Sequence, residues 1–176
     1  MFAWLRRGKP DEGVAKIYKN IVAQARRPEF YRNFGVADSL DGRFDMLTIH
    51  AMLILRRFKS EPERASKIGQ ALFDYMFVDM DRSLREIGVS DISVGKRVKQ
   101  MGSAFLGRVE AYEAGLVGAG AELEDALIRN VYRDQLPVDD GAKRLAAYMR
   151  TLDNQLRDMP LEPILAGDDT FVGVAP

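Results

Sequence analysis

Apolar residues recur every three or four positions along most of the chain, which is the spacing of one face of an α-helix. The pattern predicts helices over residues 11–27, 44–58, 62–87, 122–132 and from about 140 to 156, and another from a cap at Ser90 or Ser93 to Leu116. Residues 44–58 are apolar on nearly all sides, which indicates a central buried helix. We therefore expect an all-α fold, a single-domain multi-helix bundle built around this helix.

Capping and breaking residues set the expected limits of these helices. Asp11 is placed to cap the first helix and Pro28 to end it. Asp41 and Ser60 are candidate caps for the two helices that follow them. We expect residues 29–36 to form a turn or partial helix whose aromatic side chains fill the core or, alternatively, line a groove: Phe30, Tyr31 and Phe34.

Residues 79–112, DMDRSLREIGVSDISVGKRVKQMGSAFLGRVEAY, are the stretch around which the rest is organised. Gly88 separates two helical patterns, and glycine suits the left-handed residue that ends a helix. We therefore expect an αα-hairpin with a short turn. Asp81 and Arg85 are four residues apart, as are Arg82 and Glu86, which is the spacing of ion pairs on one helix face.

The second helix of this hairpin contains glycines that helix propensity does not explain. Each of Gly95, Gly102 and Gly107 costs about 1 kcal/mol relative to alanine. One interpretation is close packing by a neighbouring helix, and the other is a bare backbone on which another chain lies. The surrounding cations are either a solvated face or a recognition surface: Lys96, Arg97, Lys99 and Arg108.

Four segments resemble the ubiquinol–cytochrome c chaperone family: GRFD at 42–45, the pair Arg56-Arg57, residues 79–99, and FLGRVEAY at 105–112. The resemblance extends over roughly residues 34–148. It implies an all-helical chaperone without catalytic residues that helps to assemble the cytochrome bc1 complex. It also implies a client, newly made cytochrome b, together with a small partner subunit and a ribosome contact at the membrane. Without a transit peptide, the chain resembles a bacterial relative.

Together, the charge pattern, the glycines and the resemblance give a set of candidate partner-binding residues. The set is Arg43, Asp79, Asp81, Arg85, Glu86, Asp91, Gly95, Lys96, Arg97, Lys99, Gly102, Arg108 and Tyr112. For Arg43, we expect Asp79 or Asp91 to be the acidic partner. Client binding would use an apolar groove, with methionines either lining it or filling core gaps: Met76, Met80 and Met101.

Composition limits the other classes of function. The chain has 176 residues, 26 Lys+Arg against 26 Asp+Glu, no cysteine and one histidine. Disulfides, thiolate metal sites and histidine clusters are therefore excluded, and we expect no cofactor and no DNA partner. His50 is interpreted as a core histidine with satisfied hydrogen bonds. No run approaches the roughly 18 apolar residues of a membrane span, which indicates a cytoplasmic protein, at the inner face of the inner membrane by resemblance.

Two alternative functions remain open at this stage. Asp79 and Asp81 form a DxD pair of the kind that holds Mg²⁺ in helical diphosphate enzymes, but on a helix they point roughly 200° apart. A ribosome- or RNA-docking adaptor would use Lys96, Arg97, Lys99 and Arg108 instead, with strong salt dependence.

We divide the chain into an N-terminal arm, residues 1–10, the helical domain, residues 11–158, and an extended tail, residues 159–176. In the arm, apolar and basic residues (Phe2, Trp4 and Leu5 beside Arg6, Arg7 and Lys9) either touch an anionic membrane or belong to a packed end. In the tail, four apolar residues are candidates for docking on the body or on a partner: Ile164, Leu165, Phe171 and Val172.

Overall fold

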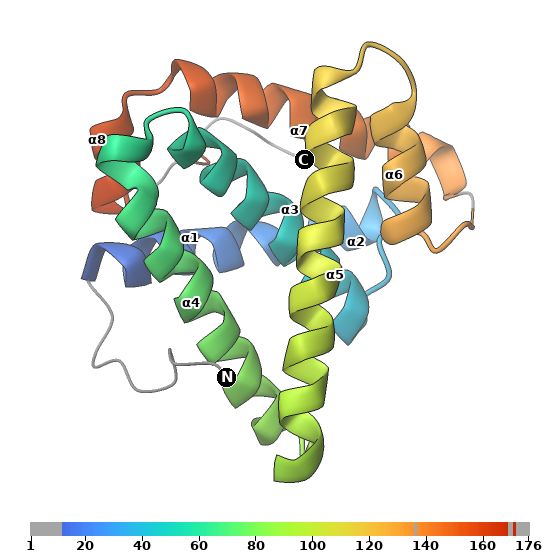
Figure 1. The fold of residues 1–176 in the computed structure, drawn as a ribbon. Helices are drawn as coiled ribbons and strands as arrows, with labels where there is room; N and C mark the ends of the chain where they lie inside the picture. The colour runs from blue at the N-terminus through green and yellow to red at the C-terminus, as the bar shows by residue number, and fades with distance from the viewer. Residues whose placement is uncertain (1–11, 136, 169–170, 172–176) are drawn as a thin grey trace.

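The computed structural model describes residues 12–135, 137–168 and 171, and all of their regular secondary structure is helical (Figure 1). This confirms the all-α, single-domain prediction. In chain order the elements are α1 (Glu12–Ala25), α2 (Pro28–Arg32), α3 (Leu40–Lys59), α4 (Pro62–Glu86), α5 (Asp91–Val117), α6 (Glu122–Asn130), the 3-10 turn η2 (Val138–Asp140), α7 (Gly141–Asp158) and α8 (Leu161–Ala166). No described helix is both long enough and apolar enough to cross a membrane.

Helix α3 is the centre of the molecule. It packs against α1, α4, α5 and α7, and its side chains are buried on almost every side between Phe44 and Ile54. The prediction of a central buried helix is confirmed. The reason is compositional, because a helix without a polar face is stable only when protein surrounds it.

His50 lies in this core and has both ring nitrogens satisfied, as predicted. Its Nδ1 is 2.7 Å from the Met46 carbonyl oxygen, to which it donates, so Nε2 accepts from the Tyr148 hydroxyl at 2.8 Å. Gln24 in turn donates to the Tyr148 oxygen at 2.9 Å. Burial lowers the pKa of His50 from 6.5 to about 4, so this histidine is neutral at physiological pH.

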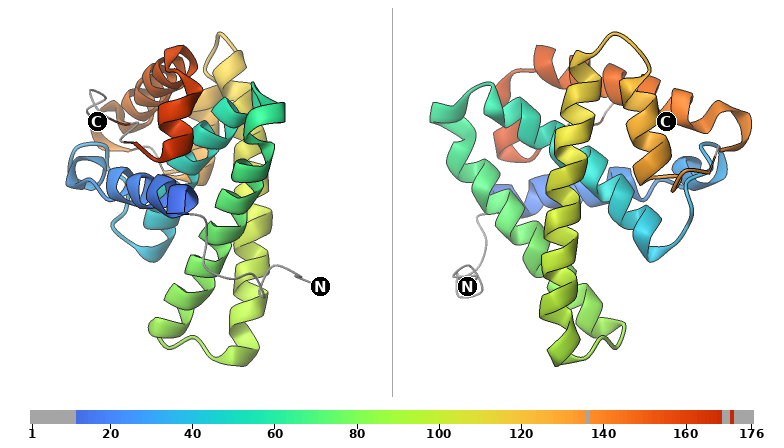
Figure 2. Two further views of the ribbon diagram at one scale, coloured as in Figure 1. Left: turned by 90° about the vertical axis from the view of Figure 1, so that its left-hand side faces the viewer. Right: turned by 45° about the vertical axis from the view of Figure 1, so that its right-hand side comes forward.

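Helices α4 and α5 form the predicted hairpin, whose closed end extends beyond the other helices (Figures 1 and 2). Gly88 adopts a φ of +90° at the turn, as expected for the residue that ends α4. Arg85 bonds Asp81 at 2.6 Å and also contacts Asp91 at the start of α5. The guanidinium therefore fastens the two helices together next to the turn.

Several predicted limits and one stripe position were wrong. Pro28 does not end α1 but begins α2, where a proline at the first helical position loses no hydrogen bond. Ser39, not Asp41, caps α3 by accepting from the Gly42 amide at 3.1 Å. Ser60 belongs to the C-terminal cap of α3 and does not cap α4. Ile87 is exposed because it follows the last turn of α4.

Residues 159–168 do not form the predicted extended tail. Helix α8 packs against α1, with Leu161 and Ile164 buried. Asn20 of α1 donates to the Gly167 carbonyl oxygen at 3.0 Å. The Phe171 ring lies 5.6 Å from His50, so it docks on the body of the protein. Residues 1–10 and Val172 lie outside the described residues.

Candidate partner-binding groove

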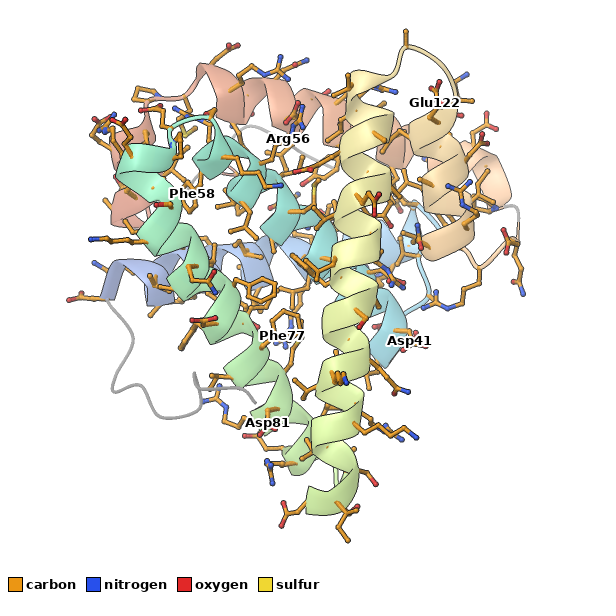
Figure 3. All side chains as sticks on the ribbon, in the orientation of Figure 1. Asp41, Arg56, Phe58, Phe77, Asp81 and Glu122 are labelled. Atoms are coloured by element: carbon orange, nitrogen blue, oxygen red, sulfur yellow. The ribbon has the colours of Figure 1, made fainter. Side chains whose placement is uncertain are left out.

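An apolar groove runs between α4 and α5, with α3 as its floor. It consists of two adjoining hollows of about 480 and 370 Å³ that share Gln70, Phe73 and Leu106. The larger hollow reaches Leu55 and Phe58 of α3, and the smaller reaches Val98 and Gly102 of α5 near the hairpin. Phe77 lies between the two diverging helices in Figure 3, and Phe58 lies farther from the turn. We refer to these two hollows as the α4–α5 groove.

Aromatic rings fill the space beneath the groove. The centroids of Phe73 and Phe77 are 4.7 Å apart, and Phe105 lies 5.6 Å from Phe73 and 6.0 Å from Phe77. Such clusters are rigid because each ring has few rotatable bonds and a large contact area. The groove therefore rests on a packed base.

Gly102 keeps the groove open toward the hairpin. A Cβ atom at this position would lie 3.7 Å from the Phe77 ring, which is ordinary van der Waals contact. Close helix packing therefore does not require glycine here, and at Gly95 and Gly107 a Cβ atom would meet nothing within 4 Å. The interpretation of these glycines as close-packing positions is wrong for Gly95 and Gly107.

Leu106 stands on the rim of the groove and is 59% exposed. Sequence reasoning missed it because it lies off the stripe that continues through Phe105 and Val109. The signal that could have identified Leu106 is its position out of phase with the core stripe of its own helix, which predicts an exposed apolar side chain.

The charged candidates of the hairpin fall into two groups. In the first group, the acids are already paired: Asp79 contacts Arg82 and accepts from Tyr18 of α1 at 2.8 Å, and Asp81 holds Arg85. Glu86 lies 3.9 Å from Arg82, so the predicted Asp81–Arg85 and Arg82–Glu86 pairs are confirmed. Burial next to the Asp79 carboxylate raises the pKa of Tyr18.

The second group is exposed. Gly95, Lys96, Arg97 and Lys99 lie on the surface of α5, and no described residue forms an ion pair with these three cations. Lys99 lines the α4–α5 groove together with Gly102, so the basic surface and the groove meet on α5. The sequence-based set of candidates therefore combines two kinds of residue. The first kind forms ion pairs within the hairpin, and the second forms an exposed basic surface.

Three further candidates lie elsewhere. Arg43 is bound to Asp38 at 2.8 Å, not to Asp79 or Asp91, because α3 begins directly after that aspartate. Tyr112 is fully buried and so does not face a partner. Arg108 also points inward, where its guanidinium contacts the Asp45 carboxylate at 2.9 Å.

Asp45 joins α3 to two other parts of the chain. Its carboxylate has no exposed area and bonds both Arg108 of α5 and Arg133, the latter at 3.1 Å. Burial raises the pKa of Asp45, and the two guanidiniums oppose that shift. Arg133 adopts a φ of +53°, a conformation costly for a non-glycine residue, to reach this carboxylate. These contacts make Asp45 and Arg108 structural residues.

The other sequence-based hypotheses concern metals and methionines. In the described part of the chain, no three acidic or histidine side chains gather as metal ligands would. Asp79 and Asp81 are each occupied by different basic partners. Met76 and Met80 are buried and fill the core, whereas Met101 is partly exposed.

Comparison with known proteins adds the following similarities. A sequence model of the family described as ubiquinol-cytochrome C chaperone matches residues 32–171. A protein from Xenopus laevis named ubiquinol-cytochrome-c reductase complex assembly factor 1 is 21% identical over 135 residues, which cover 77% of this chain and 68% of that protein. Its namesake from Mus musculus is 21% identical over 150 residues, 85% of this chain but 51% of its own length. The crystal structure of the Cbp3 homolog from Brucella abortus is 39% identical, with a TM-score of 0.78 over 89% of this chain and 86% of that one.

Proposed function

We propose that this protein, which belongs to the ubiquinol-cytochrome C chaperone family, promotes assembly of the cytochrome bc1 complex by holding a client segment in the α4–α5 groove. The family and the names of the relatives support an assembly factor that is not an enzyme. For the client we propose newly made cytochrome b, an apolar subunit. The role is to cover an apolar helix of the client until its own partners replace the chaperone.

The observation that carries this proposal is the exposed apolar rim of the groove. Leu106 is exposed, and Leu55, Val109 and the base residue Phe73 are only partly buried. A bound apolar helix would remove this area from water, which contributes roughly 25 cal/mol per Å². Helix-in-groove recognition of this kind is read through apolar side chains one turn apart.

A photo-reactive amino acid at position 106 tests the proposal in the native host. We expect it to cross-link cytochrome b while the same substitution at Val117, an exposed apolar residue at the end of α5 outside the groove, does not. A Leu106→Asp variant is expected to lower the amount of assembled bc1 complex, and Val117→Asp to leave it unchanged. Equal cross-linking from both positions, or full assembly with Leu106→Asp, would contradict the proposal.

A second function is favoured by the open basic surface. Lys96, Arg97 and Lys99 are exposed and without an ion-pair partner among the described residues. We propose that these three cations contact ribosomal RNA. Such contact would place the groove near the client chain as the ribosome makes it. Such binding falls steeply with salt because counterions are released from phosphates. Binding in the apolar groove does not depend on salt in this way.

A further inference from the structure

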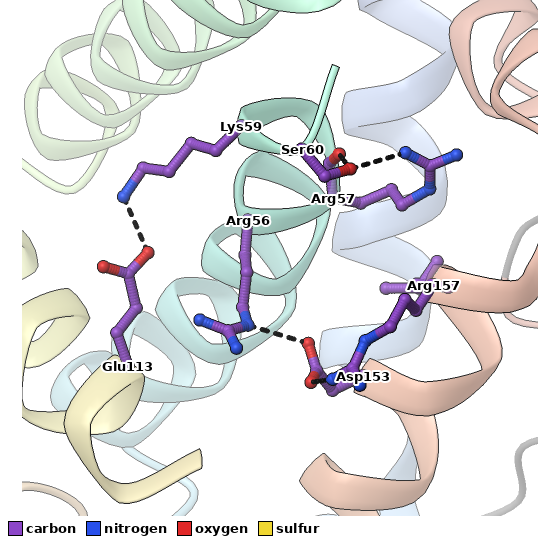
Figure 4. A pocket seen from close by; sticks show the side chains of 8 residues that line it. Arg56, Arg57, Lys59, Ser60, Glu113, Asp153 and Arg157 are labelled. Carbon is purple, nitrogen blue, oxygen red and sulfur yellow. Dashed lines mark hydrogen bonds and ion pairs between the residues drawn. The ribbon is translucent and has the colours of Figure 1, made fainter. Parts of the chain in front are cut away.

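At one end the α4–α5 groove adjoins a basic pocket. This pocket has a volume of about 360 Å³ and is lined by the last turn of α3, by α7 and by Glu113 of α5 (Figure 4). Lys59 and Glu113 line both the pocket and the groove. Figure 3 labels Arg56, which lines the pocket, and Phe77, which lines the groove.

Positive charge exceeds negative charge in this pocket. Asp153 is shared by two guanidiniums, with Arg56 at 3.0 Å and Arg157 at 2.5 Å. Arg157 is 62% exposed, and one carboxylate cannot neutralise both arginines. Arg57, by contrast, is neutralised by Glu61, and its two terminal nitrogens also donate to Ser60 and the Met159 carbonyl oxygen. The uncompensated charge therefore lies between Arg56 and Arg157.

The pair Lys59–Glu113 stands where the pocket meets the groove. Its Nζ–Oε1 distance is 2.6 Å, and the lysine side chain is largely exposed (Figure 4). An exposed pair of this kind is weak, because water competes for both groups. It is therefore not a strong barrier between the pocket and the groove.

We propose that groove and pocket form one amphiphilic site that takes an apolar client helix with a carboxylate at its C-terminal end, seated between Arg56 and Arg157. The inference rests on the proposed client-binding function and adds the direction in which the client helix lies in the groove. A guanidinium matches a carboxylate with two parallel hydrogen bonds. The C-terminal end of a helix is also the negative end of its dipole, so this direction is favoured over the reverse. The N-terminal end then lies toward Lys99 and the hairpin.

The test uses the full chain and three fluorescent apolar helical peptides of equal length in mild detergent. One carries two aspartates at its C-terminal end, the second carries them at its N-terminal end, and the third has two lysines at its C-terminal end. We expect the first to bind about tenfold more tightly than the others, as for one charge-assisted contact. Arg157→Gln is expected to abolish this preference, whereas Arg129→Gln, an exposed arginine on α6, preserves it.

The outcomes separate this inference from the function on which it rests. Equal binding of all three peptides, still reduced by Gly102→Leu, overturns the acidic anchor and leaves the groove intact. Absence of binding by any peptide overturns both. An anionic lysophospholipid that binds with the same dependence on Arg157, when no peptide binds, assigns the site to lipid and also overturns the proposal.

Discussion

At the scale of single residues, the same residue type has opposite effects at two places in the fold. A Cβ atom on Gly42 would lie 1.9 Å from the Ala37 carbonyl oxygen, whereas on Gly107 it would meet nothing within 4 Å. Gly42 is the first residue of the GRFD segment and allows the chain before α3 to pass close to the helix. Gly107 only weakens α5.

We therefore predict that replacing glycine by alanine changes stability in opposite directions at Gly42 and Gly107. Gly42→Ala should lower the free energy of unfolding by about 1–3 kcal/mol, because backbone must move to admit the methyl group. Gly107→Ala should raise it by about 0.5–1 kcal/mol, because alanine favours the helix and the space is open. Urea titrations followed by circular dichroism measure both, and changes of the same sign would contradict the packing described for Gly42.

His50 predicts how stability depends on pH. Its pKa is about 4 in the folded protein and 6.5 when exposed, so between these values the unfolded chain binds more protons. Stability from this group is therefore complete above pH 6.5 and is lost as the pH falls toward 4, by about 3 kcal/mol. The comparison is with His50→Gln, whose unfolding free energy should fall less over this range. Parallel pH profiles for the two proteins would be incompatible with a buried neutral histidine.

At the scale of helices, the segments that carry the family resemblance meet in space. Asp45 of GRFD binds Arg108 of FLGRVEAY, and Arg108 also stacks over the Phe44 ring at 5.4 Å. Two segments far apart in the sequence thus form one joint between α3 and α5. In the segment that begins at Asp79, the Arg85–Asp91 pair joins the two helices of the hairpin, and Asp79 itself connects the hairpin to α1.

Breaking this joint should cost far more than breaking a surface pair. Asp45→Asn leaves Arg108 and Arg133 without a buried carboxylate, and we expect a loss of about 3–5 kcal/mol of stability. Asp38→Asn removes an exposed partner of Arg43 and should cost about 0–1 kcal/mol. Thermal unfolding of both variants provides the measurement, and similar losses would mean that the Asp45 cluster is not a structural joint.

The sequence predicted what depends on local periodicity and missed what depends on the approach of distant segments. The buried surroundings of α3 follow from its own apolar residues, and the hairpin follows from Gly88. Arg108 was assigned to a binding surface because its partner Asp45 lies 63 positions away. An apolar groove for the client was expected, but the residues that form its walls were not predicted. The walls depend on how far α4 and α5 diverge, and that depends on the α3 side chains packed beneath them.

At the scale of the whole molecule, α5 carries two surfaces with different physics. Leu106 and Gly102 face the apolar groove, whereas Lys96 and Arg97 lie on the exposed basic surface. Neither surface depends on the other for folding, because the groove base is formed by aromatic rings and the hairpin is fastened by Arg85. If the proposed functions hold, this arrangement would let the protein contact a ribosome and a client at the same time.

The two surfaces should therefore be separable by mutation. Gly102→Leu places a side chain in the groove without displacing backbone, so we expect loss of client cross-linking with unchanged sedimentation with ribosomes. Lys96→Glu combined with Arg97→Glu should do the reverse, with ribosome association lost and peptide binding kept, because repulsion from phosphate replaces attraction. Raising salt from 50 to 200 mM should imitate the second variant and not the first. If both variants lose both interactions while remaining folded, α5 carries a single composite surface and client and ribosome compete for it.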